Sequence, residues 1–171
     1  MRRSVPRFKL IVDLTLISRG PQQTIQYGRT FAGVLEPGSV IGLEGELGSG
    51  KTCFIKGLAS VLAGVPEHEV TSPTFTFMQE YPGTVPLYHF DLYRIASSAD
   101  LTELGLEECL YGTGITVIEW ADRAEGTLPR ERVIISMEYI AEQERRITFS
   151  AQGEKHAALL TTYKNKIGGG I

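Results

Sequence analysis

The stretch Gly45-Glu46-Leu47-Gly48-Ser49-Gly50-Lys51-Thr52 fits the phosphate-binding P-loop pattern at every fixed position: two glycines separated by four residues, then lysine and threonine. The apolar run at residues 39–43 before it indicates a short buried strand. Apolar residues then recur at a helical spacing until Gly64 and Pro66 end the pattern: Phe54, Ile55, Leu58, Val61 and Leu62. The sequence therefore predicts a strand that turns through a glycine-rich loop into a helix.

This loop has the composition of a phosphate site. Three glycines let the backbone curl so that successive N–H groups face one anion, and the following helix presents the positive end of its dipole to that anion. Lys51 would reach the β- and γ-phosphates of a nucleotide, and the hydroxyl of Thr52 would ligate the magnesium ion that bridges them. The predicted nucleotide-binding residues are Glu46, Leu47, Gly48, Ser49, Gly50, Lys51, Thr52 and Cys53. The alternative is a glycine-rich surface turn that happens to contain a lysine.

The composition suits one globular domain and argues against several functions. The chain has 171 residues, of which 42% are hydrophobic, enough to bury a real core. A formal net charge of -3 gives no basic footprint, so any connection to RNA would be indirect. The two cysteines, Cys53 and Cys109, have no metal-ligand spacing and favour reduced thiols. No apolar run approaches the roughly 18 residues that span a bilayer, so the sequence predicts a cytoplasmic protein.

Strands and helices alternate along the chain. Besides the elements around the loop, strands are predicted at residues 8–15, 74–81, 85–93, 115–118, 132–140 and 145–150, and helices at 22–35, 101–111 and 156–162. The strands on either side of Pro82-Gly83 would form a hairpin. This order predicts an α/β fold like that of P-loop NTPases: a mixed, largely parallel sheet with helices on both faces. One domain would cover residues 1–162, and residues 163–171 would be a flexible tail.

Two acidic residues lie at the ends of predicted strands. Glu119 follows the apolar run 115–118, and Asp91 ends another largely apolar strand. Nucleotide hydrolysis needs a second protein anchor for magnesium and a group that orients the attacking water, and either acid could serve either task. Both are predicted catalytic residues, and Glu119 is a predicted metal ligand with Thr52. The alternatives are that Asp91 caps the following turn and that Glu119 pairs with Arg123.

The segment 71–74, Thr-Ser-Pro-Thr, concentrates hydroxyl groups before a strand. This composition suits a loop that hydrogen-bonds a terminal phosphate and rearranges when the phosphate leaves, so Ser72 and Thr74 are predicted switch or partner-contact residues. The alternative is a simple proline turn. Trp120, next to Glu119, fits either the core or a partner contact. His89 is interpreted as a packed strand residue and not as a catalyst.

Four motifs, in this order, resemble the TsaE (YjeE) family. They are Gly-Glu-Leu-Gly-Ser-Gly-Lys-Thr at 45–52, Thr-Ser-Pro-Thr-Phe at 71–75, His-Phe-Asp-Leu-Tyr-Arg at 89–94 and Ile-Glu-Trp at 118–120. The resemblance covers roughly residues 22–149. It implies a bacterial ATPase that uses ATP and Mg²⁺ to assist the making of threonylcarbamoyladenosine at adenosine 37 of tRNAs. In the family a heterodimer of TsaD and TsaB transfers the group, TsaE docks there, and ATP hydrolysis supports repeated turnover.

The resemblance also implies roles for single residues. Lys51 and Thr52 would take phosphate and magnesium, and Asp91 and Glu119 would act in hydrolysis or metal binding. Trp120 would be the tryptophan beside that acid, and residues 72–74 would match the family's switch-like loop. The sequence departs from the family pattern at Cys53, where a polar residue is expected, and at Gly20-Pro21-Gln22, which affects only how the first helix begins and which nucleotide-base contacts lie there.

Three other functions compete with this one. A small P-loop kinase needs an acceptor pocket and usually an arginine-bearing lid, and the sequence shows no such arginine cluster. A GTPase would need an Asp-x-x-Gly switch, which is missing. A nucleotide-gated binding module, in which hydrolysis is incidental and partner docking is the function, overlaps in part with the family's role.

Overall fold

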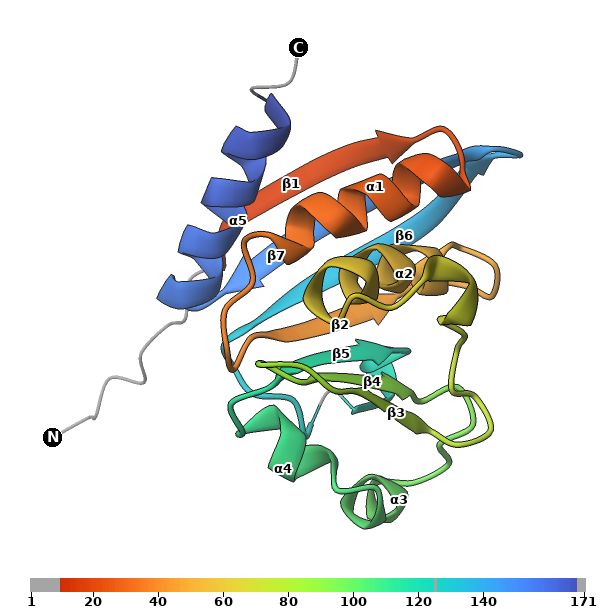
Figure 1. Cartoon of the computed structure of the whole chain (residues 1–171), viewed down its shortest axis with the longest axis vertical. Helices are drawn as coiled ribbons and strands as arrows, with labels where there is room; N and C mark the ends of the chain where they lie inside the picture. Colours follow the sequence, from red (N-terminus) through yellow and green to blue (C-terminus); the bar gives the residue numbers. More distant parts are fainter. Residues whose placement is uncertain (1–9, 125, 169–171) are drawn as a thin grey trace, which may run out of the picture.

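The computed structural model describes residues 10–124 and 126–168. Their strands form one seven-stranded sheet in the order β1-β7-β6-β2-β5-β4-β3 (Figure 1). The strands are β1 Leu10–Ser18, β2 Val40–Glu44, β3 Met78–Tyr81, β4 Leu87–Asp91, β5 Ile115–Glu119, β6 Arg132–Ala141 and β7 Glu144–Gln152. The helices are α1 Pro21–Ala32, α2 Lys51–Leu62, α3 Ser98–Glu103, α4 Leu106–Leu110 and α5 Glu154–Gly168, with short 3₁₀ helices η1 Glu67–Glu69 and η2 Ala121–Ala124.

Parallel pairing is confined to the centre of the sheet. Strands β6, β2, β5 and β4 are parallel to one another, whereas β1, β7 and β3 run antiparallel to their neighbours. The outer pairs β3–β4 and β6–β7 are hairpins, and a short turn can join only antiparallel strands. The predicted mixed sheet and the predicted hairpin around Pro82-Gly83 are confirmed. As a result, the carboxyl ends of β2, β5 and β4 meet at one edge of the sheet.

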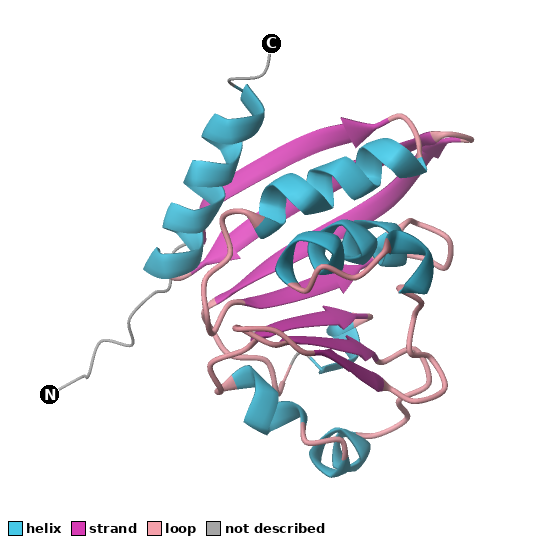
Figure 2. Ribbon diagram, in the orientation of Figure 1, coloured by secondary structure: helices cyan, strands magenta, loops and turns pink. Residues whose placement is uncertain are grey.

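Helices cover both faces of the sheet (Figure 2). Because successive strand residues point to opposite faces, β2 contributes Ile41 and Leu43 to the core beneath α1, α2 and α5, and Val40 to the smaller core beneath α3, α4 and η2. Burial on both faces explains why β2 and β5 are continuous apolar runs in the sequence. None of the described helices is long and apolar enough to cross a membrane.

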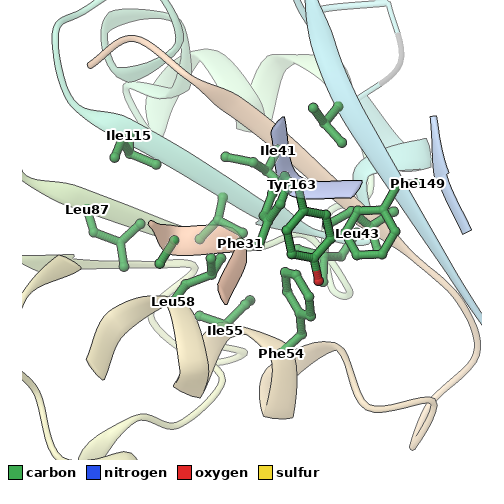
Figure 3. Close-up of a cluster of buried hydrophobic side chains, with 14 of the residues drawn as sticks. Phe31, Ile41, Leu43, Phe54, Ile55, Leu58, Leu87, Ile115, Phe149 and Tyr163 are labelled. Atoms are coloured by element: carbon green, nitrogen blue, oxygen red, sulfur yellow. The ribbon is translucent and has the colours of Figure 1, made fainter. Parts of the chain in front are cut away.

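Helix α5 is longer than the sequence predicted, and its Tyr163 belongs to the core. The Tyr163 side chain is 0% exposed, with its ring centroid 4.9 Å from that of Phe31 and 5.2 Å from that of Phe149 (Figure 3). Its hydroxyl donates a hydrogen bond to the carbonyl oxygen of Tyr27 at 3.0 Å. The predicted flexible tail is therefore wrong for residues 163–168, because one face of this lysine-rich segment packs on the sheet. Residues 169–171 lie outside the described part of the chain.

Other predicted elements also have different bounds; the helix predicted at 22–35, for example, ends at Ala32. The predicted helix at 101–111 is divided into α3 and α4, because Gly105 adopts a left-handed conformation with φ 68°. The predicted strand at 74–81 begins only at Met78, since residues 74–76 form a turn and Phe77 has φ 63°. Strand β1 extends to Ser18, beyond the predicted end at residue 15, and residues 8–9 of that prediction lie outside the described residues.

We predict that Tyr163→Ala lowers the free energy of unfolding by about 3–5 kcal/mol, the usual cost of truncating a large buried aromatic side chain. Urea denaturation followed by circular dichroism measures this loss. Lys164→Ala, an exposed neighbour on the same helix, is the matched control and should change the stability by less than about 0.5 kcal/mol. Equal, small effects of both substitutions would mean that α5 does not stabilise the core.

Candidate nucleotide-binding site

The loop between β2 and α2 is held in a shape that glycine alone permits. Its three glycines have positive φ angles, 141° at Gly45, 78° at Gly48 and 105° at Gly50. A Cβ atom on Gly45 would lie 2.4 Å from the carbonyl oxygen of Met137 in the adjacent strand β6, so a larger residue does not fit there. The start of the loop is thus packed against the sheet, whereas residues 46–48 are exposed.

Lys51, the first residue of α2, is buried beneath this loop. Its side chain is only 4% exposed, and Nζ donates hydrogen bonds to the carbonyl oxygens of Gly45 at 2.6 Å and Glu46 at 2.9 Å. The ammonium also lies 4.0 Å from the ring centroid of Trp120, a cation–π contact. Burial lowers the pKa of Lys51, and the nearby carboxylates of Glu119 and Asp91 oppose that shift. The lysine is held by neutral partners, so its charge stays available to an anion.

Thr52 and Glu119 are brought together by the parallel pairing of β2 and β5. Glu119 ends β5 opposite Leu43, the second-last residue of β2, and is only 3% exposed. The hydroxyl of Thr52 lies 3.0 Å from Glu119 Oε1 and 3.2 Å from Oε2, to which it donates. The alternative of a Glu119–Arg123 ion pair is not found among the described residues, since the Arg123 guanidinium instead donates to the carbonyl oxygen of Tyr93. A hydroxyl and a carboxylate are thus paired at the start of α2.

Asp91 lies opposite Glu119, in register on the next parallel strand. Its Oδ2 accepts hydrogen bonds from the hydroxyl of Ser72 and, at 2.9 Å, from that of Thr74. Its Oδ1 accepts the backbone N–H of Tyr93 at 2.8 Å, so Asp91 also caps the turn after β4, as the alternative interpretation held. The carboxylate therefore connects the loop at residues 71–77 to the end of the strand. Two of its four lone-pair directions are taken up by that loop.

One cavity of about 330 Å³ collects most of the predicted site residues. Its lining comprises Leu47, Gly48, Gly50, Lys51, Thr52, Cys53, Ser72, Thr74, Asp91, Tyr93, Glu119 and Trp120. Of the predicted binding residues, Ser49 is buried and Glu46 is exposed, and neither lines the cavity. The sequence analysis missed Tyr93 as a site residue. Its position inside the motif at 89–94 was the signal that could have found it.

A second cavity, of about 380 Å³, adjoins the opposite side of the loop. It shares Gly48, Gly50 and Cys53 with the first, and its other walls come from the start of α1 and from the tip of the β6–β7 hairpin: Gly20, Pro21, Thr24, Tyr139, Glu142, Gln143 and Arg145. No motif marks the hairpin residues, because only the folded sheet places them beside the loop. The glycine loop thus separates two adjoining hollows.

Two residues have contacts that refine their sequence interpretation. Trp120 has φ 59° and is half-buried. Its ring contacts the ammonium of Lys51 and lies 5.0 Å, centroid to centroid, from the ring of Tyr93. It is therefore a wall of the cavity and not a residue of the deep core. His89 is packed in the sheet, as interpreted, but its Nε2 lies 2.8 Å from Glu119 Oε1, so it also contacts the site.

These features define a P-loop α/β protein. A glycine loop joins a central parallel strand to a helix, a buried lysine begins that helix, and acids lie at the ends of neighbouring strands. A sequence model of the family described as "Threonylcarbamoyl adenosine biosynthesis protein TsaE" matches residues 18–147. The chain belongs to the TsaE family, as its motifs predicted.

Individual relatives agree with this assignment. The tRNA threonylcarbamoyladenosine biosynthesis protein TsaE of Treponema pallidum (strain Nichols) is 48% identical over 132 residues, which cover 77% of this chain and 96% of the relative. The protein of the same name from Bacillus subtilis (strain 168) is 42% identical over 140 residues, 81% of this chain and 86% of the relative. The crystal structure of Bacillus subtilis YdiB superimposes with a TM-score of 0.77 at 34% identity, covering 92% of this chain and 98% of that one.

We predict that Gly45→Ala destabilises the protein more than Gly48→Ala. Both residues have positive φ, which costs a non-glycine residue about 1–2 kcal/mol, but only at Gly45 would the added methyl group also collide with backbone. At Gly48 no atom lies within 4 Å of the added Cβ. Midpoints of urea unfolding for the two variants measure the difference. Equal midpoints would show that the contact with Met137 does not constrain the loop.

Proposed function

We propose that this protein binds ATP with magnesium at the glycine loop and hydrolyses it, as the ATPase component of the machinery that makes threonylcarbamoyladenosine on tRNA. One observation carries the proposal: the adjacent residues Lys51 and Thr52 and the distant acids Asp91 and Glu119 line a single cavity beside a loop shaped by positive-φ glycines. The names of the relatives support the tRNA pathway.

The loop and Lys51 suit a triphosphate. The start of α2 offers backbone N–H groups and the positive end of the helix dipole, and Lys51 adds a charge that no carboxylate among the described residues neutralises within 4 Å. An arriving phosphate would replace the carbonyl oxygens of Gly45 and Glu46 as partners of Nζ. The cavity on the other side of the loop gives the nucleoside room.

The residues present also fit a magnesium ion. Thr52 and Glu119 supply hard oxygen ligands within 3.2 Å of each other, and Mg²⁺ prefers oxygen ligands together with phosphate and water. The described residues contain no group of three or more His, Cys, Asp and Glu side chains that would hold a metal alone, which suits an ion that enters with its nucleotide. When bound, magnesium would neutralise charge on the phosphates.

The two acids have different surroundings, and we assign them different roles. Glu119 is bonded to Thr52, the expected metal-side hydroxyl, so Glu119 would hold magnesium. Asp91 lies on the other strand, bonded to Ser72 and Thr74, so it would orient the attacking water. Because those hydroxyls occupy Asp91 Oδ2, the loop at 71–77 would have to exchange these bonds before Asp91 can act on water. This exchange would make the loop a switch.

Hydrolysis by the isolated protein should be slow, because no arginine is among the residues that line the cavity holding Lys51. Arg94 lies over the rings of Phe75 and Phe77, and Arg123 lies over those of Tyr93 and Trp120. Neither lines the cavity that holds Lys51. We therefore propose that TsaD and TsaB, acting with it in the cytoplasm, complete the site. The protein would reach tRNA only through that complex, a role that a net charge of -3 favours over autonomous binding to nucleic acid.

A second candidate function is the nucleotide-gated binding module. The observation in its favour is the same pair of hydroxyl bonds on Asp91, because an acid engaged in this way is not free to activate water. In that case ATP binding alone would control docking, and hydrolysis would be incidental.

We predict that ATP·Mg²⁺ changes the fluorescence of Trp120, the only tryptophan of the chain, because phosphate would draw Lys51 away from the indole ring.

We also predict that Lys51→Ala weakens ATP binding roughly 10- to 100-fold, which is the effect of losing a charged hydrogen bond. Isothermal titration calorimetry measures this loss. Lys56→Ala, on the same helix but outside the cavity, is the control and should bind as the wild type does. Unchanged affinity in Lys51→Ala would refute the site.

We further predict that Asp91→Asn still binds ATP but does not sustain turnover. With TsaD, TsaB, tRNA and threonylcarbamoyl-adenylate, the wild-type protein and ATP should give many modified tRNAs per complex, whereas Asp91→Asn should stop after about one, because the complex would not be reset. Asp122→Asn, an exposed acid near Lys51, serves as the control. Full turnover with Asp91→Asn would favour the binding module over the ATPase.

A further inference from the structure

His89 is a buried histidine that the proposed chemistry does not use. It lies on β4 two residues before Asp91, so both side chains project from the same face of the sheet. The side chain is 0% exposed, and its ring stacks on that of Tyr81 from β3, with centroids 6.4 Å apart and an interplanar angle of 24°. From this position the imidazole reaches across to the end of β5, where Glu119 lies.

The contact between His89 and Glu119 has a defined direction. A carboxylate only accepts hydrogen bonds, so the Nε2 atom of His89, 2.8 Å from Glu119 Oε1, carries the proton and donates it. The other ring nitrogen, Nδ1, is buried with no partner among the described residues. The bond to Glu119 is therefore the polar contact that this imidazole makes.

Glu119 has a second side-chain donor, Thr52, which is the proposed magnesium ligand. Among the described residues, the carboxylate of Glu119 accepts hydrogen bonds from two side chains, the Thr52 hydroxyl and His89. The oxygen of Thr52 is the proposed magnesium ligand, so its geometry changes when the ion enters and leaves. His89 lies outside the cavity lining and is fully buried in the sheet, so its bond to Glu119 does not involve a proposed metal ligand as donor.

We propose that His89 is a positioning residue: its Nε2–H fixes the carboxylate of Glu119 beside Thr52, and so prepares the acid for magnesium before the ion arrives. This inference rests on the proposed function, and it adds to it the residue that sets the metal affinity of the site. Without the bond, the Glu119 side chain is free to turn towards the ammonium of Lys51, which lies at the same cavity. Groups behind a metal ligand typically change metal affinity by about 10- to 100-fold.

Two substitutions at His89 separate hydrogen bonding from packing. His89→Leu keeps an apolar side chain of similar size but removes the donor, whereas His89→Gln places an amide N–H close to the position of the imidazole Nε2. His156→Leu is the matched control. His156 is equally buried in the described structure and its Nδ1 also lacks a partner there, but its Nε2 accepts a hydrogen bond from the backbone of Val40, at the opposite end of β2 from the loop.

The test measures metal affinity directly. Binding of Mn²⁺ to the protein–ADP complex is followed by electron paramagnetic resonance, alongside the Mg²⁺ concentration that gives half-maximal ATP hydrolysis. His89→Leu should weaken Mn²⁺ binding and raise that concentration by roughly 10-fold or more, and His89→Gln should restore both to within about 3-fold of the wild type. ATP binding in EDTA should change by less than about 2-fold in all variants. His156→Leu should lower the unfolding midpoint and leave the metal dependence unchanged.

The outcomes are distinguishable. Wild-type metal affinity in His89→Leu would overturn the inference and leave the proposed function intact. The same holds if His89→Gln binds the metal as weakly as His89→Leu does. A wild-type protein that binds neither ATP nor Mn²⁺–ADP would refute the proposed function and this inference together. Without any nucleotide, ¹H–¹⁵N NMR should show a slowly exchanging His89 Nε2–H signal that is lost in Glu119→Ala. Its absence from the wild type would overturn the inference alone.

Discussion

The parallel pairing of β2, β5 and β4 is the constraint on which the rest of the site depends. Parallel strands end at the same edge of a sheet, so this pairing fixes Glu119 beside the loop that follows β2 and sets Asp91 opposite Glu119. A slip of one residue in either register would turn the acid to the other face of the sheet, away from Thr52. Close packing opposes such a slip in β2, because a Cβ atom at the place of Gly42 would lie 2.7 Å from Ala121 Cβ and 2.8 Å from Ile134 Cδ1. Core packing and site geometry are thus the same constraint.

The buried charges at this edge are arranged so that they do not cancel one another. Lys51 bonds to loop carbonyls and lies on the Trp120 ring, Glu119 bonds to Thr52 and His89, and Asp91 bonds to Ser72 and Thr74. Each charge is held by neutral groups or by one histidine at distances typical of hydrogen bonds. Such preorganised groups interact strongly with a charged ligand, because few solvent molecules have to rearrange when it binds.

The loop at residues 71–77 connects this interior to the surface. Its Ser72 and Thr74 bond to buried Asp91, while Phe75 of the same loop is 82% exposed. Phe77, with φ 63°, donates its N–H to the carbonyl oxygen of Pro73 and accepts from the N–H of Asp91, so the loop is attached to β4 at both its side chains and its backbone. A change in the bonds at Asp91 would therefore alter the outline of an exposed aromatic surface beside the cavity.

The sequence by itself determined the strand–loop–helix around Lys51, the α/β class, the family and most of the residues that line the cavity, because these follow from local patterns: glycine spacing, apolar periodicity and acids at strand ends. Only the tertiary structure decided the rest. Tyr163 is a core residue because α5 packs on the sheet, and His89 meets Glu119 from a different strand. These facts depend on contacts between residues distant in the sequence, which no local pattern records.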